Sequence, residues 1–154
     1  MSNISTAYDA IRTEIGAILP THTELSNPYF VERESDLNFN QAWGLAFGDA
    51  NNTNRNIGCR LSVQRDFIFV ITRKIFKTSH RAIDARIDEE KLLFEDQFLV
   101  IKALEKSPVL NASSSGIAKI AYVQDGGLEF VRSDRTNLIM IQTIMSLEYF
   151  EDLS

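Results

Sequence analysis

The sequence predicts an α+β fold, with one mostly antiparallel sheet and two helices packed on one of its faces. Apolar residues recur every three to four positions in two segments, as in amphipathic helices, and alternate with polar residues in several others, as in half-buried strands. The order along the chain is helix, strands, helix, strands, with no internal repeat, which is typical of an α+β domain. The chain has 154 residues, a length that fits one domain, 1–154.

Two helices are predicted, at residues 4–19 and 88–106. Pro20 ends the first, because the residue before a proline is disfavoured in the α conformation. The apolar face of this helix comprises Ile4, Tyr8, Ile11, Ile15 and Ile18. The acidic run 88–90 is placed in the first turn of the second helix, where it complements the helix dipole. The apolar residues that identify this second helix are Leu92, Phe94, Phe98, Ile101 and Leu104.

The first strands are predicted after a polar segment. Residues 21–40 are expected to form an extended arm or loop. Residues 41–48 are predicted to be a short strand, and 49–55 a turn-rich loop. The longest alternation of apolar and polar residues, 57–76, is expected to bend or turn back near 64–66, because a single strand of that length is unusual.

The C-terminal part of the chain is predicted to hold a linker, a hairpin and a last strand. Residues 111–116 (NASSSG) are expected to be a flexible linker. The run 125–127 (DGG) is expected to turn between strands at 117–123 and 128–131, because these residues tolerate positive φ. The last strand, 138–150, is apolar on both faces, so we expect it to be central in the sheet or covered by a second layer.

The composition argues against a membrane protein and against a dedicated nucleic-acid-binding protein. The chain is 44% hydrophobic and 24% charged, as in ordinary globular proteins. Its net charge of −5 opposes binding to phosphates, which depends on Lys and Arg. No signal-peptide pattern and no apolar run of about 20 residues occur, so we expect the protein to remain in the cytoplasm or in a particle assembled there. Cys59 is the single cysteine, which excludes a disulfide within the chain.

No pattern predicts a catalytic, cofactor-binding or metal site. His22 and His80 are expected in exposed polar loops, and Cys59 is expected to be a small buried apolar residue in a strand. The segment 49–60 departs from a calcium-binding loop, because it lacks the glycine at the sixth position and has Arg60 in place of the last ligand. Phosphate-binding, dinucleotide-binding and zinc-binding spacings are also missing from the sequence. These observations predict a protein that is not an enzyme.

The order and sizes of the predicted elements resemble the tail terminator proteins of long-tailed bacteriophages. The segments that carry the resemblance are 4–19, 58–76, 88–106 and 137–153. The resemblance implies a homohexameric ring, assembled in the host cytoplasm and located in the tail or neck of the virion. There it caps the tail tube and joins tail to head. The implied partners are further copies of the chain, the tail tube protein and a head-completion or connector protein, with DNA passing through without specific binding. Segment 21–40 is longer and more polar than this family leads us to expect.

Two sets of residues are predicted to bind these partners. An adjacent subunit is expected to cover one face of the last strand, because that strand is apolar on both sides. The expected subunit interface comprises Met140, Gln142, Ile144, Arg65 and Arg73. Small polar residues suit wet, adjustable contacts, so two loops are expected to meet the axial partners. The residues concerned are Asn51, Asn52, Asn54, Ser113 and Ser114.

Other interpretations stay open. The basic residues along 60–81 are expected to form a solvated strand face, or else a site for an acidic protein surface. A head-completion or connector protein, or another oligomeric adaptor, would fit the same fold. A small-molecule-binding α+β domain or enzyme would instead need a closed pocket that holds His80 or Cys59 beside carboxylates.

Overall fold

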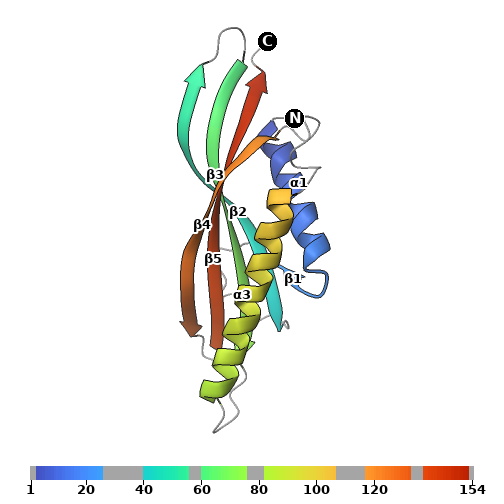
Figure 1. The fold of residues 1–154 in the computed structure, drawn as a ribbon, viewed down its shortest axis with the longest axis vertical. Helices are drawn as coiled ribbons and strands as arrows, with labels where there is room; N and C mark the ends of the chain where they lie inside the picture. The colour runs from blue at the N-terminus through green and yellow to red at the C-terminus, as the bar shows by residue number, and fades with distance from the viewer. Residues whose placement is uncertain are drawn as a thin grey trace.

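A computed structural model describes residues 3–25, 40–55, 60–75, 82–106, 117–132 and 137–152, and confirms the predicted α+β fold class. Its elements are α1 (Asn3–Ile18), β1 (Thr23–Glu24), β2 (Gln41–Arg55), β3 (Arg60–Ile75), α3 (Ala82–Lys106), β4 (Ile117–Arg132) and β5 (Asn137–Asp152). Figure 1 shows an elongated molecule in which the four long strands run along the long axis and both helices lie beside the sheet.

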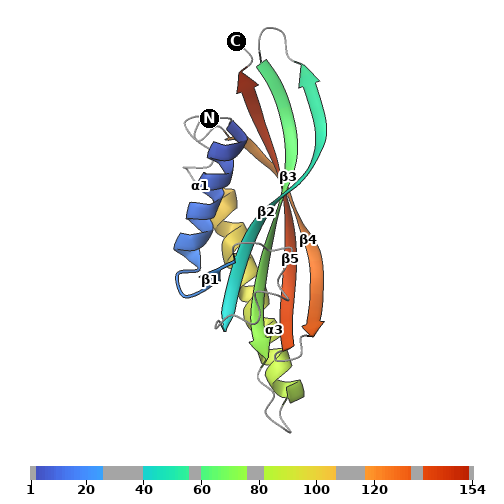
Figure 2. The same cartoon turned by 180° about the vertical axis from the view of Figure 1, so that it is seen from behind.

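The sheet has the order β1-β2-β3-β5-β4, so β3 and β5 are surrounded by other strands. The long strands pair antiparallel, whereas β1 pairs parallel to the start of β2. The β3–β5 ladder runs without a register shift from Arg60 opposite Asp152 to Ile75 opposite Asn137. The expected turn back near 64–66 is therefore wrong. Instead, the strands cross near the middle of the molecule, where the sheet twists strongly (Figures 1 and 2).

Two segments predicted to be turns belong to strands. Residues 49–55 continue β2, and 125–127 lie inside β4. Each segment carries a shift of register against its neighbour, between Phe47 and Asn52 in β2 and between Asp125 and Gly127 in β4. Glycine and small polar residues suit a β-bulge as well as a turn, because both interrupt regular pairing. The long partners β3 and β5 continue past these points, and their continued pairing makes each irregularity a bulge.

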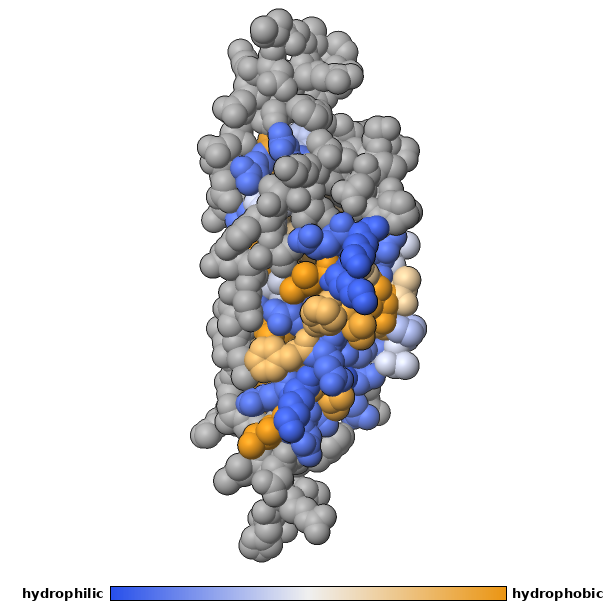
Figure 3. Space-filling model, viewed as in Figure 1, coloured by the Kyte–Doolittle hydropathy of each residue, from blue (hydrophilic) through white to orange (hydrophobic). Residues whose placement is uncertain are grey.

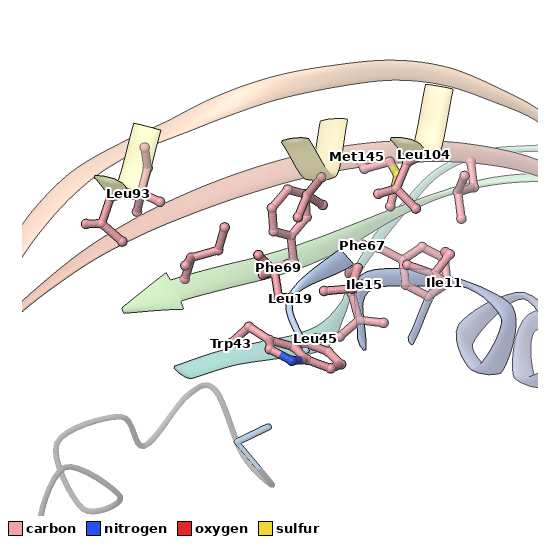
Figure 4. Packing of buried hydrophobic residues seen from close by; sticks show 14 of the residues in the cluster. Ile11, Ile15, Leu19, Trp43, Leu45, Phe67, Phe69, Leu93, Leu104 and Met145 are labelled. Carbon is pink, nitrogen blue, oxygen red and sulfur yellow. The ribbon is translucent and has the colours of Figure 1, made fainter. Parts of the chain in front are cut away.

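Both helices pack against the same face of the sheet. Ile11 and Ile15 of α1 and Leu104 of α3 belong to one buried cluster with Phe67 and Phe69 of β3. Further strand members of this cluster are Trp43, Leu45, Ile71, Ile75, Ile139, Ile141, Met145 and Leu147. Figure 4 shows members of this cluster, among them Ile11, Phe67 and Leu104, meeting between helices and strands. Burying each large apolar side chain contributes about 1.5–3 kcal/mol, so this layer is the main source of stability.

The opposite face of β3 and β5 holds a second, smaller cluster. Its buried members are Leu25, Ala42, Val70, Leu138 and Met140, with Ile68 partly buried beside them. Among the described residues, Leu25 is its single member from outside the strands. Alternate residues of β5 thus enter clusters on opposite sides of the sheet. This confirms the prediction that the last strand is central and apolar on both faces.

The helix bounds match the prediction at one helix and differ at the other. Helix α1 agrees with the predicted 4–19 to within one residue. Helix α3 ends at Lys106 as predicted, but begins at Ala82 and not at Asp88. The acidic run 88–90 therefore lies beyond the first turn, and the dipole argument does not account for it.

Gly48 and Gly16 give a matched test of this packing. A Cβ on Gly48 would lie 2.9 Å from Asp66 Cβ and 3.0 Å from the Asp66 carbonyl oxygen, so β2 and β3 would have to separate. A Cβ on Gly16 would meet Trp43 at 3.8 Å, an ordinary contact. We expect Gly48→Ala to lower the free energy of unfolding by about 1–3 kcal/mol. Gly16→Ala should raise it by up to about 1 kcal/mol, because alanine is favoured over glycine in a helix. Urea titrations at one protein concentration measure the free energy of unfolding of both variants. Equal changes in the two variants would contradict the close approach of β2 and β3 at Gly48.

Candidate interaction surfaces

Four ionisable side chains join three elements where the helices meet the sheet. His22 follows α1, Arg73 lies on β3, and Glu89 and Asp96 lie on α3. Nε2 of His22 is 2.9 Å from Oδ2 of Asp96, and Nη2 of Arg73 donates to the same oxygen over 2.9 Å. Nη1 of Arg73 donates to Oε2 of Glu89 over 3.4 Å. These contacts hold α3 in one position against β3 and the segment that follows α1.

Burial and hydrogen bonding act in opposite directions on Asp96. The side chains of His22, Arg73 and Asp96 are 5%, 12% and 12% exposed. Burial by itself would raise the pKa of Asp96, but hydrogen bonds from His22 and Arg73, and their charges, outweigh it. The pKa of Asp96 therefore lies below its usual value, and the carboxylate is charged at neutral pH. Next to it, Nε2 of Gln97 donates to Oγ1 of Thr143 over 2.9 Å, which adds a buried tie to β5.

The paired histidine and aspartate have the chemistry of two members of a hydrolase triad. In this chain the aspartate also binds Arg73, and among the described residues Nδ1 of His22 has no hydrogen-bond partner. Across the same ranges, no group of three or more His, Cys, Asp or Glu is arranged to hold a metal ion. The expectation that His22 is exposed is wrong, because its side chain is buried in this cluster. His80 and Cys59 lie outside the described residues.

The five residues expected at a subunit interface are divided between the two faces of the sheet. Arg65 and Arg73 lie on the face that carries the helices, where Arg65 donates to the Gly48 carbonyl over 3.2 Å. Met140, Gln142 and Ile144 lie on the opposite face, with Met140 buried in the smaller cluster and the other two half-buried. Arg73 therefore departs from the expected solvated strand face, because its charge is neutralised within the chain.

Of the five residues expected to meet axial partners, Asn51, Asn52 and Asn54 lie in β2 and not in a loop. Backbone pairing sets Asn52 opposite Gln64 and Asn54 opposite Ser62. This part of the β2–β3 ladder reaches one end of the long axis, beyond both helices (Figure 1). Ser113 and Ser114 lie outside the described residues.

The outer face of α3 is a feature that the sequence reasoning missed. Its exposed large apolar side chains are Ile87 (48%), Leu92 (39%), Phe94 (47%), Phe98 (63%) and Leu99 (48%). The inward side chains are Leu93, Asp96, Gln97, Val100 and Leu104. Figure 3 shows apolar side chains among hydrophilic ones over this helix. Ile87, Phe94 and Phe98 are spaced by seven and four residues, a pattern that marks an apolar line separate from the buried one.

No helix in the described ranges is long and apolar enough to cross a membrane.

Comparison with known proteins finds little similarity in sequence. No model of a protein family and no curated protein matches this chain. Among solved structures, a chain in the virion of a native gene transfer agent particle is similar over 94% of this chain and 91% of that chain. The two are 13% identical, with a TM-score of 0.36. Neither a family nor a function follows from similarity at this level.

The charge cluster predicts how stability depends on pH. Because the pKa of Asp96 is lowered in the folded chain, its charge stabilises the fold above the unfolded value of about 4. This contribution is lost as the pH falls through the lower, folded value. Asp96→Asn should reduce the free energy of unfolding by about 3 kcal/mol at pH 7, since it leaves the mostly buried Arg73 with only the longer contact to Glu89. The deficit should shrink in acid below about pH 4.

The matched control for this prediction is Asp9→Asn, which removes an exposed carboxylate from α1. It should change the free energy of unfolding by less than about 0.5 kcal/mol at either pH. Urea unfolding of the three proteins at neutral and acidic pH makes the comparison. A deficit of Asp96→Asn that stays constant with pH would contradict the charged state of the cluster.

Proposed function

We propose that this chain is a structural subunit that assembles with copies of itself into a ring, and that the ring is the tail terminator of a long-tailed phage. It caps the tail tube and joins the tail to the head through a head-completion or connector protein. The observation that carries the proposal is the pair of open edges of the sheet. The resemblance of the sequence to tail terminators supports the specific role, because the element order on which it rests is that of the fold.

The two edges suit head-to-tail assembly. Strand β4 ends the sheet on one side, and no described strand pairs with its outer edge. On the other side, β1 covers β2 only at Ala42 and Trp43, and the Tyr8 hydroxyl donates to the Leu45 carbonyl over 3.2 Å. Among the described strands, none pairs with this edge beyond those positions. Long open edges are templates for pairing with another chain.

Strand direction supports a ring in which all subunits point the same way. The four long strands alternate in direction, so β2 and β4 run opposite to each other. A neighbour in the same orientation would therefore place its β2 antiparallel to β4, which continues the alternation. A repeated head-to-tail contact of this kind closes into a ring when its rotation allows. Such a ring has two different rims, as a joint between a tail and a head requires.

The expected contact residues fit this arrangement in part. We assign Gln142 and Ile144, which remain half-buried on the helix-free face, to the subunit contact. Met140 and Arg73 are already packed or paired within the chain. Residues 51–54 lie at one end of the long axis, beyond both helices, and we assign them to the contact with an axial partner. The net charge of −5 would let DNA pass without binding to the ring.

Proline substitution tests the edge contact. The N–H groups of consecutive strand residues point to opposite sides, so one of Glu129 and Phe130 donates toward β5 and the other toward the open edge. We expect one of Glu129→Pro and Phe130→Pro to unfold the chain. The other should fold, because proline is tolerated at an edge. By native mass spectrometry the folded variant should form no ring, whereas the wild type should assemble into hexamers. A hexamer formed by the folded variant would rule out this edge as the contact.

The role at the joint has its own test. Shortening segment 111–115 should leave rings intact, because the proposed ring contacts lie in the strands. In the phage that encodes the chain, electron microscopy should then show separate heads and tails. Normal particles would contradict the axial assignment, and loss of the ring itself would place the segment in the subunit contact.

A further inference from the structure

The exposed side of α3 carries charged residues in a regular order beside its apolar side chains. Among the α3 side chains that the structure describes, the exposed charged ones are, in chain order, Asp88, Lys91, Glu95, Lys102, Glu105 and Lys106. Their signs alternate along the chain, beginning with an acid and ending with a base. None of these six makes an ion pair with a described residue. As far as the described residues show, these charges are therefore available to a partner.

When the order of charges along α3 is placed against the same order read backwards, each charge meets one of opposite sign. When a second α3 is laid antiparallel with both helices centred near Phe98, Asp88 comes opposite Lys106, Lys91 opposite Glu105, and Glu95 opposite Lys102. Each of these pairs occurs twice, because a two-fold contact repeats every interaction. In a parallel arrangement in register, every charge would instead face its own sign. Opposite charges across a contact favour one orientation and disfavour the other.

Exposed apolar side chains of α3 lie at the centre of the same antiparallel arrangement. Phe98, with 63% of its surface exposed, lies at the centre of the antiparallel pairing, with Phe94 one turn away. Two copies would therefore bring four aromatic rings together between the charged pairs. Large apolar side chains at the centre and charges around them are typical of protein interfaces. Figure 3 shows the alternation of apolar and hydrophilic side chains over this helix.

We infer that the outer face of α3 binds the same face of a second copy of this chain, with the two helices antiparallel across a two-fold axis near Phe98. The contact goes beyond the proposed ring, because it joins two copies that point in opposite directions. Ring closure needs a head-to-tail contact, which we assign to the strand edges. The paired helices hold free subunits or whole rings together two at a time, and cover exposed apolar side chains, with Phe98 and Phe94 at the centre.

A charge exchange between Glu95 and Lys102 tests the pairing. Glu95→Lys alone and Lys102→Glu alone each create two like-charge contacts across the axis. Each should weaken the two-fold association by about tenfold or more at low salt. The double variant Glu95→Lys with Lys102→Glu restores opposite charges and should associate to within about threefold of wild type. Sedimentation equilibrium measures the association, in a background with the folded edge variant of β4 so that rings do not form.

Two further variants complete the experiment. Asp9→Lys changes an exposed charge on α1 and should leave the association unchanged. Phe98→Ser should abolish the pairing while the circular dichroism spectrum stays that of the folded chain, because Phe98 is mostly exposed. Two results would overturn the antiparallel pairing. One is that the single charge variants associate as the wild type does, and the other is that the double variant associates no more strongly than the single variants.

The outcome separates this inference from the proposed function. If the otherwise wild-type chain forms hexamers that the variants at positions 95 and 102 do not change, the proposed ring stands. This holds whether or not the pairing of α3 is observed. Dimers that follow the charge exchange, in a protein that never forms hexamers, would support the α3 contact and contradict the ring.

Discussion

The unbroken ladder between β3 and β5 is the constraint on which the rest of the structure depends. It pairs Arg60–Ile75 with Asn137–Asp152 without a shift. Because side chains alternate along a strand, the constant register places Phe67, Phe69 and Ile141 on one side and Val70 and Met140 on the other. A slip by one residue would exchange the two sets. The helices, the flanking strands and both apolar clusters are positioned by this one register.

The contact of α3 with the sheet is specified by polar groups as much as by apolar ones. Asp96 and Gln97 point inward and bind Arg73, His22 and Thr143. Buried polar pairs of this kind contribute little net stability, but removing one partner is costly. They therefore favour one position of the helix over others with similar apolar burial. With these polar residues turned inward, part of the apolar surface of α3 must face the solvent, and that surface supplies the self-complementary face.

The features of the molecule that support the proposed function are surfaces. Open strand edges, the half-buried Gln142 and Ile144, and the apolar side of α3 are all places where another chain can bury area or complete hydrogen bonds. In the described residues, His22, Arg73 and Asp96 are instead paired within the chain and connect α3 to the sheet. This division suits the proposed subunit that works by assembly, because its interior groups pair within the chain and its surface offers contacts to other chains.

Local patterns in the sequence determined which segments are helix and which are strand, because period and proline position act over a few residues. Helix α1, the end of α3 at Lys106 and the two-sided burial of β5 follow from such patterns. What depended on distant partners was decided only by the tertiary structure. Asp125 and the glycines after it are compatible with either a turn or a β-bulge. The continuous pairing with β5 makes this interruption a bulge. His22 is polar and follows a turn, which predicts exposure, but it is buried because Asp96, far away in the sequence, meets it. Phe94 and Phe98 have the periodicity of a helix, yet their exposure was set by which side of α3 matched Arg73 and Thr143 on the sheet.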